Sequence, residues 1–190
     1  MTLITAKWTI EDYHQMIAAG ILEDRPVELL NGEIVEMSPE GEPHAYYSNE
    51  TANYLRKLLG DSVAIREAKP ITIPEINSEP EPDIAIVRPL GRAYLQHHPY
   101  PEDIFWLIEF SDSSLKKDLE AKAKIYAQAS IPEYWVVNLK EMQLVVMRTV
   151  RSAKLSPVNG EYQSQVTMKP GTISPLAFPD IAMAISRLLD

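Results

Sequence analysis

The chain contains no cysteine among its 190 residues. This absence excludes a disulfide scaffold, a thiolate zinc site, an iron–sulfur cluster and a cysteine nucleophile. The chain also lacks any apolar run close to the roughly 20 residues that a membrane span requires. Its N-terminus shows no basic-then-apolar signal pattern. Together these absences predict a cytoplasmic protein without a membrane segment.

Basic residues are in deficit, since 18 Lys and Arg face 27 Asp and Glu, which gives a net charge of −9. This balance argues against broad nonspecific binding to nucleic acid, which normally requires a basic surface. Glycine is scarce, with 7 residues, and no glycine-rich phosphate loop or dinucleotide motif is present. GxSxG and HExxH motifs are missing as well, so the sequence gives little support to the enzyme classes that these motifs mark.

The residues that are present predict one α/β (α+β) domain over 1–190. The length fits one domain, and 45% hydrophobic and 24% charged residues are ordinary for a globular protein. The order helix, three strands, helix, strand in the middle of the chain indicates an α/β core with antiparallel additions. Periodicity and turn signals predict helices over 9–19, 43–59 and 114–128, a short helix near the C-terminus, a hairpin over 26–37 around Asn31-Gly32, and strands over 62–68, 70–74, 82–88, 104–110, 134–139, 142–150 and about 162–168.

Two carboxylates stand out in the predicted strands. Asp83 opens an apolar strand directly after Pro82, which fixes the approach of the chain, although an Asp at such a place is often only a turn residue. Glu109 lies in the apolar run Ile104–Phe110. A buried carboxylate is costly without a partner, so Glu109 needs a metal, hydrogen bonds or a structural salt bridge.

Lys122 is the third candidate, because it falls on the apolar stripe of the helix over 114–128. At about 100° per residue, Leu115, Leu119 and Tyr126 share this stripe. A lysine there either snorkels at the edge of the core or pairs with an acid. Because the helix follows the strand that carries Glu109, we expect Lys122 to pair with Glu109.

The other charges of this helix are expected to have simpler roles. Asp118, one turn before Lys122, is expected to form an ordinary i,i+4 pair with it. The remaining charges lie off the stripe and are expected to be solvated: Lys116, Lys117, Glu120 and Lys124.

Two carboxylates on adjacent strands and a lysine suit phosphodiester hydrolysis. Carboxylate oxygens are preferred ligands of Mg²⁺ and Mn²⁺. Such a metal polarises a phosphodiester and lowers the pKa of a bound water. The lysine can orient that water or stabilise negative charge that develops on the phosphate.

The spacing from Pro82-Asp83 to Glu109 resembles the PD-(D/E)xK nuclease superfamily. The stretches VELLNGEIVEMSPEGEPHA (27–45), EPDIAIV (81–87) and 98–139 resemble one bacterial branch, the Uma family of restriction endonucleases. The resemblance spans nearly the whole chain. It implies a restriction-endonuclease-like αβββαβ core over about 43–139 with antiparallel hairpin additions.

The resemblance also implies a DNA endonuclease that depends on Mg²⁺ or Mn²⁺, with Asp83 and Glu109 as metal ligands. The superfamily motif places its lysine at position 111, where this chain has Ser111. In the Uma family the lysine comes from the following helix, so the resemblance implies Lys122 as the catalytic lysine. The helical stripe indicates Lys122 independently.

Glu33 and His44 lie in matching segments and are accessory candidates. Glu33 follows the hairpin turn and is otherwise a surface residue, while His44, near the start of a helix, could contact a water or have no role. His97 and His98 lie in a proline-rich loop and are expected to be structural. Core positions rather than a base-stacking platform are expected for Tyr134, Trp135 and Val136.

Two functions therefore remain open. The first is a metal-dependent DNA endonuclease, with weak, metal-dependent DNA affinity because four acids between Ile73 and Asp83 lead into the proposed site. The second is a non-catalytic nuclease fold that serves as a binding or assembly module, which the acidic charge favours. Family analogy adds the expectation of a homodimer.

Overall fold

The structure is a computed structural model that describes residues 5–149, 160–169 and 171–189. A π-helix over Lys117–Lys122 runs directly into the helix Ala123–Gln128. The helices and strands in chain order are α1 (Ile10–Ala18), β1 (Val27–Leu30), β2 (Glu33–Glu36), α2 (Glu42–Leu59), β3 (Ala64–Glu67), β4 (Ile84–Val87), β5 (Ile104–Ser111), α3 (Ala123–Gln128), β6 (Glu133–Asn138), β7 (Gln143–Arg148), β8 (Ser164–Met168), β9 (Thr172–Ile173), β10 (Met183–Ala184) and α4 (Ser186–Leu189).

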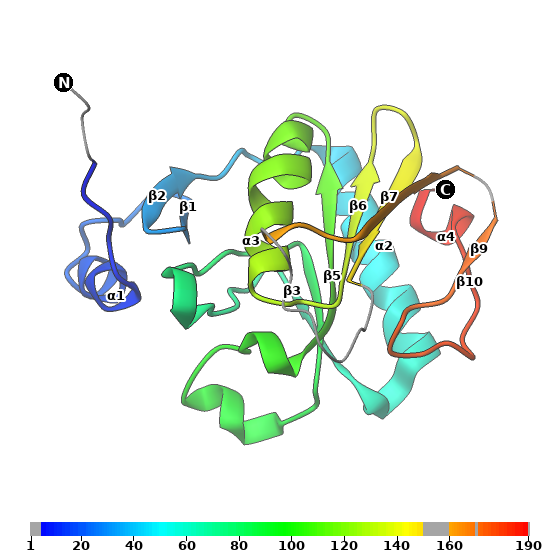
Figure 1. Cartoon of the computed structure of the whole chain (residues 1–190), viewed down its shortest axis with the longest axis horizontal. Coiled ribbons are helices and arrows are strands. Elements are labelled where there is room, and N and C mark those ends of the chain that lie inside the picture. Colours follow the sequence, from blue (N-terminus) through cyan, green and yellow to red (C-terminus); the bar gives the residue numbers. More distant parts are fainter. Residues whose placement is uncertain (1–4, 150–159, 170, 190) are drawn as a thin grey trace.

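A six-stranded mixed sheet in the order β3-β4-β5-β6-β7-β8 forms the centre of the molecule. β5 and β6 are parallel, and all the other neighbours in this sheet are antiparallel. A parallel pair requires a crossover, which the π-helix and α3 supply. In Figure 1, α3 lies over one face of the sheet and α2 over the other. The element order from α2 to β6 confirms the predicted mixed fold with an αβββαβ core.

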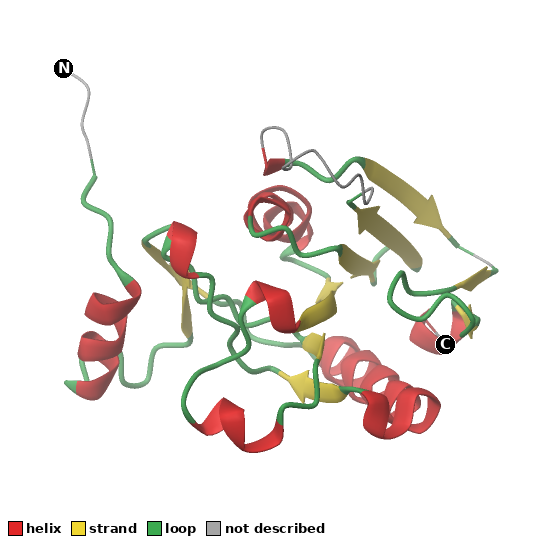
Figure 2. Cartoon of the chain, turned by 60° about the horizontal axis from the view of Figure 1, so that its bottom comes forward, coloured by secondary structure: helices red, strands yellow, loops and turns green. Residues whose placement is uncertain are grey.

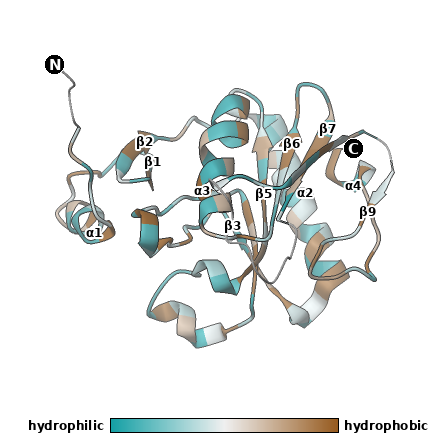
Figure 3. Cartoon of the chain, viewed as in Figure 1, coloured by the Kyte–Doolittle hydropathy of each residue, from teal (hydrophilic) through white to brown (hydrophobic). Residues whose placement is uncertain are grey.

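The two faces of the sheet pack against separate apolar clusters, because successive side chains of a strand point to opposite faces. On β5, Trp106, Ile108 and Phe110 pack in the cluster under α2, whereas Leu107 packs in the cluster under α3. Figure 3 shows brown along the central strands, whereas the side of α3 that faces the viewer is largely teal. Glu109 has the parity of Leu107, so the alternation directs its carboxylate toward α3.

α1 and the β1–β2 hairpin lie beside the sheet, at the left of Figure 1, around a small apolar cluster of their own. Thr9 and Asp12 form a capping box at the start of α1, where the sequence predicts the helix to begin. Asn31 and Gly32 have φ angles of 50° and 74°, which a type I′ turn requires. The predicted first helix and hairpin are confirmed.

The strand predicted over 70–74 is wrong, because the described structure has a loop there. Figure 2 shows the connections around β3 and β4 as loops with short helical turns. Pro70 and Pro74 remove backbone donors at both ends of the segment. Ile71 and Ile73 are nevertheless fully buried. Their alternation therefore marks a buried loop rather than a strand.

The strand predicted over 142–150 is observed as β7, and Val150 lies outside the described residues. The predicted core positions Tyr134, Trp135 and Val136 are fully buried in β6. Within the described part of the chain, none of the helices has the length and hydrophobicity that crossing a membrane would demand.

Candidate active site

A pocket of about 330 Å³ lies where β4 begins, β5 approaches its end, and the start of α2 and the π-helix meet. Six carboxylates and two lysines are among the described residues that line it, so its wall carries an excess of negative charge. The charged and titratable residues of this lining are Glu40, His44, Glu81, Asp83, Glu109, Asp112, Lys117, Asp118 and Lys122. Asp83, Glu109 and Lys122, the three residues predicted to act together, all line this pocket.

Asp83 and Glu109 are brought side by side by the register of β4 and β5. Ile84 pairs with Ile108 in this antiparallel ladder, so the next position along pairs Asp83 with Glu109. The backbone N–H of Phe110 donates a hydrogen bond of 2.6 Å to Oδ2 of Asp83. This bond fixes the Asp83 carboxylate at the entrance to the strand, as expected after Pro82.

Glu109 is buried, and its Oε1 accepts hydrogen bonds from Nζ of Lys122 at 2.8 Å and from the hydroxyl of Tyr126 at 3.1 Å. Burial raises the pKa of Glu109 well above its ordinary value, while Lys122 acts in the opposite direction. The neighbouring carboxylates of Asp83 and Asp118 raise the pKa of Glu109 further. Additional positive charge beside Glu109 would therefore stabilise its ionised form.

Lys122 is almost completely buried and is surrounded by oxygen atoms. Besides Glu109, its Nζ lies 3.3 Å from Oε2 of Glu28 and 3.5 Å from the backbone oxygen of Glu81. Burial alone would lower the pKa of Lys122, but the carboxylates of Glu109 and Glu28 raise it above its ordinary value. The ammonium group is therefore held charged at the base of the pocket.

The π-helix explains why one lysine of this helix was misjudged. An α-helix would place Lys117 and Lys122, five residues apart, on different faces, whereas the wider i→i+5 turn brings them to the same side. Both contact Glu28, Lys117 at 2.9 Å and Lys122 at 3.3 Å. The prediction that Lys117 is solvated surface charge is wrong, because its side chain is only 25% exposed.

Asp118 is held by two serine hydroxyls rather than by the predicted pair with Lys122. Its Oδ2 accepts hydrogen bonds from Oγ of Ser111 at 2.7 Å and from Oγ of Ser114 at 2.6 Å. Asp118 is buried together with Ser111, the last residue of β5. Ser111, which stands where the superfamily motif has its lysine, therefore anchors the helix that carries Lys122 to the strand that carries Glu109.

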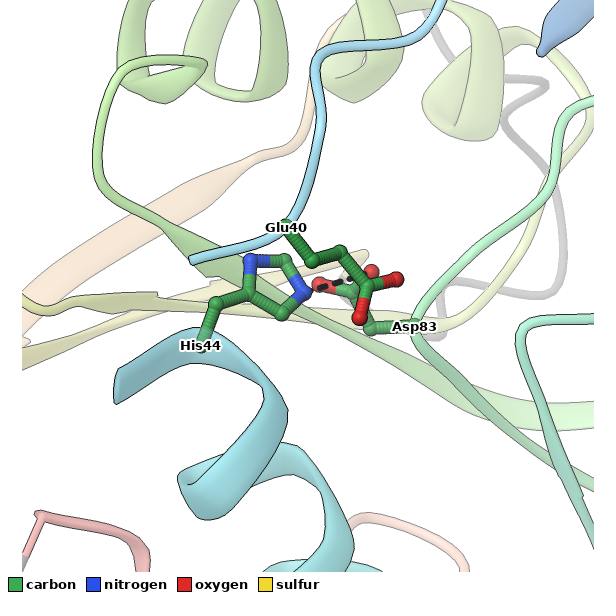
Figure 4. A group of neighbouring side chains, drawn as sticks. All are labelled: Glu40, His44 and Asp83. Carbon is green, nitrogen blue, oxygen red and sulfur yellow. Dashed lines mark ion pairs between the residues drawn. The ribbon is translucent and has the colours of Figure 1, made fainter. Parts of the chain in front are cut away.

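Glu40, His44 and Asp83 form a group at the mouth of the pocket whose ligand atoms all lie within 4.8 Å of one another. Figure 4 shows the imidazole of His44 on the first turn of α2, with the carboxylates of Glu40 and Asp83 beside its ring nitrogen. Nε2 of His44 lies 3.1 Å from Oδ1 of Asp83 but makes no well-directed hydrogen bond, although the atom is buried. A neutral imidazole nitrogen beside two carboxylates can bind a cation in place of this contact with Asp83.

The carboxylates of Asp83 and Glu40 influence the protonation of the His44 imidazole. Burial alone would lower the pKa of His44, but the carboxylate of Asp83 raises it above its ordinary value, with a smaller contribution from Glu40. The surroundings of His44 therefore favour positive charge at Nε2, whether it comes from a proton or from a metal ion.

Glu40 and Glu28 are the two site residues that the sequence reasoning missed. Glu40 stands in the loop two residues before α2 begins, and its only signal in the sequence is an acidic residue close to His44. Glu28 belongs to a strand whose four residues are all buried, and its only local signal is a charge within an apolar run.

The accessory candidate Glu33 is not brought to the pocket. It is exposed on β2, with 59% of its side chain accessible, and pairs with Lys7. His97 stacks on Tyr100 outside the pocket lining, and Nδ1 of His98 lies 3.4 Å from a guanidinium nitrogen of Arg66. Of the histidines singled out from the sequence, His44 is the one that lines the pocket.

Comparison with known proteins shows a match to one sequence family and a similarity to a solved structure. The sequence model of the Uma2 family, described as "Putative restriction endonuclease", matches residues 10–186. No curated protein matches the chain. The fold is similar to a crystal structure from Anabaena variabilis ATCC 29413, described as a "putative nuclease belonging to DUF820", with a TM-score of 0.68 and 15% sequence identity. The alignment covers 95% of this chain and 97% of that chain.

Proposed function

The chain belongs to the Uma2 family, and on that premise we propose that it is a divalent-metal-dependent endonuclease that hydrolyses phosphodiester bonds of DNA. The observation that carries the proposal is the meeting of Asp83, Glu109 and Lys122 in one pocket. Two carboxylates and one lysine are the groups that this reaction requires, and the sequence predicts the same three residues independently.

The residues present fit a metal ion of the Mg²⁺ or Mn²⁺ class. Glu40, His44 and Asp83, whose ligand atoms lie within 4.8 Å of one another, would hold it, and Glu109, which lines the same pocket, would supply a further carboxylate oxygen. The buried Nε2 of His44 without a well-directed hydrogen bond supports this assignment, as does the excess of carboxylates over lysines in the lining. The raised pKa of Glu109 also fits, since burial makes its charge costly until a cation offsets it.

The chemistry divides between the cation and the protein. A bound divalent cation supplies polarisation of the phosphodiester and lowers the pKa of a bound water. Lys122, held charged beside Glu109, stabilises negative charge that develops on the phosphate. The Phe110 N–H and the Tyr126 hydroxyl keep the carboxylates of Asp83 and Glu109 in fixed orientations. DNA is the proposed substrate, and its affinity is expected to depend on metal because the pocket is acidic.

Cleavage of supercoiled plasmid tests this function. Nicked or linear plasmid is expected with Mn²⁺ or Mg²⁺, and EDTA is expected to stop the reaction. Calorimetric titration with Mn²⁺ runs in parallel. Binding of Mn²⁺ without cleavage under any condition would favour the alternative function, a non-catalytic binding module, over the endonuclease.

His44 is expected to make the site selective for Mn²⁺ over Mg²⁺. An imidazole suits transition metals better than Mg²⁺, whereas carboxylates serve both ions. In the variant His44→Gln, the ratio of the two affinities should fall toward one, mainly through weaker Mn²⁺ binding. Calorimetric titration with each ion measures this, and an unchanged ratio would show that His44 is not a ligand.

The affinity for Mn²⁺ is expected to increase with pH. Metal binding requires neutral imidazole, and Asp83 raises the pKa of His44, so a proton competes with the metal until the pH exceeds this raised value. Below it, affinity should decrease with falling pH, and this component should disappear in His44→Gln. His14→Gln is the matched control, since His14 is 51% exposed and pairs with Glu79 away from the pocket. Equal pH dependence in both variants would contradict the assignment.

A further inference from the structure

We infer that Glu28, on the β1–β2 hairpin outside the αβββαβ core, is a positioning residue that holds Lys122 and Lys117 toward the pocket. This inference rests on the proposed function for its catalytic meaning. The contacts that carry it are separate from those that define the metal site.

Glu28 is the convergence point of three polar groups. Its Oε1 accepts a hydrogen bond of 2.9 Å from Nζ of Lys117, and its Oε2 lies 3.3 Å from Nζ of Lys122. Oε2 also accepts a hydrogen bond of 3.2 Å from the backbone N–H of Glu81, two residues before Asp83. One carboxylate therefore fixes both lysines and the chain segment that leads into Asp83.

The Glu28 side chain is completely inaccessible to solvent and is not part of the pocket lining. It is therefore out of reach of a substrate or a metal ion in the pocket. Because Glu28 does not line the pocket, it can position the reacting groups through the lysine side chains that it contacts.

The distribution of charge around Lys122 shows why a second carboxylate is needed. Glu109 binds Lys122 more closely, at 2.8 Å, but Glu109 is also a proposed metal ligand. A cation beside Glu109 would weaken its attraction for Lys122 and repel the ammonium group. Glu28 lies outside the pocket, so its attraction for Lys122 remains when a cation is bound.

Backbone hydrogen bonds hold the β1–β2 hairpin, and with it Glu28, in place beside the pocket. An isolated two-stranded hairpin is marginally stable, but β1–β2 is bonded to the loop that precedes β4. The N–H of Glu79 donates to the oxygen of Leu29 at 2.7 Å, and the N–H of Gly32 donates to the oxygen of Asn77 at 2.8 Å. These bonds are made by Leu29 and Gly32, which follow Glu28 in the hairpin, so the place of Glu28 relative to the pocket is set by backbone structure as well as by side-chain packing.

The test is a kinetic double-mutant cycle between Glu28 and Lys122. Glu28→Gln, which keeps the volume and removes the charge, should lower kcat about 10- to 100-fold, the usual effect of losing a supporting contact. The dissociation constant for Mn²⁺ should change far less than kcat, because the amide oxygen of glutamine can still accept the hydrogen bond from the Glu81 N–H that leads into Asp83. In a Lys122→Met background, the same substitution should have little further effect on kcat.

The matched control is Glu36→Gln. Glu36 lies on the partner strand of the same hairpin and is exposed, pairing with Arg25. Wild-type kcat in Glu36→Gln is expected. A purely structural role of Glu28 would lower kcat by the same factor with and without Lys122, and that result would overturn the inference.

A second cycle, on unfolding by urea, tests the contact without requiring activity. The unfolding free energies of Glu28→Gln, Lys122→Met and the double variant should be non-additive, whereas additive losses would contradict the contact.

If the wild type does not cleave DNA but the unfolding cycle shows coupling, the proposed function fails and the contact stands. If the wild type cleaves and Glu28→Gln keeps full kcat, the positioning role fails alone. Should Glu28→Gln not fold, Glu28→Asp, which keeps the charge but shortens its reach, replaces it in the cycle, and an equal loss of kcat with and without Lys122 would refute the role.

Discussion

Asp83→Asn is expected to abolish Mn²⁺ binding and to lower the rate of DNA cleavage by about 10³-fold, since a catalytic cation is worth several kcal/mol of transition-state stabilisation. Asp83 lies between Glu109 on one side and the pair Glu40 and His44 on the other side of the proposed metal site. Its register neighbour is Glu109, and its carboxylate is within 4.8 Å of the ligand atoms of Glu40 and His44. Removing its charge therefore takes away the carboxylate that lies next to each of the other proposed ligands.

The asparagine variant is expected to fold, which makes the result interpretable. The amide oxygen of Asn can accept the hydrogen bond that the Phe110 N–H donates to Asp83, so the buried backbone donor stays paired. Asp61→Asn is the matched control, because Asp61 is exposed in a 3₁₀ turn and the charge change is the same. Calorimetric titration with Mn²⁺ compares the two. Equal affinities in both variants would show that Asp83 is not a ligand.

Lys122→Met is expected to lower the cleavage rate by about 10²- to 10³-fold while leaving Mn²⁺ binding in place, because it removes the cation that stabilises the reacting phosphate. Methionine fills the volume of the lysine stem without its charge. The loss should appear in kcat, since the lysine acts on charge that develops during the reaction.

The same substitution should also destabilise the fold. It leaves the buried Glu109 without its cation and removes one of the two lysines from Glu28, and breaking a buried pair costs about 3–5 kcal/mol. Lys124→Met is the control, because Lys124 is exposed on the same helix. Unfolding in urea measures the stability and single-turnover cleavage measures the rate. A Lys122→Met protein with wild-type cleavage would exclude Lys122 from the reaction.

The core of the fold could be predicted from the sequence, and so could the grouping of Asp83, Glu109 and Lys122 in one site. The alternation in β5 and the apolar stripe of the following helix place Glu109 and Lys122 on facing sides, and this needs only the two regular periods. The stripe predicts Lys122 correctly although the helix begins with a π-turn. The same π-turn makes the prediction for Lys117 wrong, because ideal α-helical geometry places Lys117 on the solvent-facing side of the helix.

The contacts that the sequence did not predict join segments far apart along the chain. Glu28 reaches Lys117 across 89 positions, and no local pattern marks such a pair. Glu40 lies in a loop, where hydrophobic periodicity gives no orientation. Glu33 shows the opposite error, since its segment matches the family but its side chain faces solvent and pairs with Lys7. The homodimer expected from family analogy stays a prediction.

The most direct test of the central claim is plasmid cleavage by the wild type, Asp83→Asn and Lys122→Met, side by side with and without Mn²⁺. The account predicts nicked plasmid with the wild type in Mn²⁺ and almost none with either variant or with EDTA. Cleavage by all three proteins at the same rate, or by none of them, would contradict the assignment of this pocket as a nuclease active site.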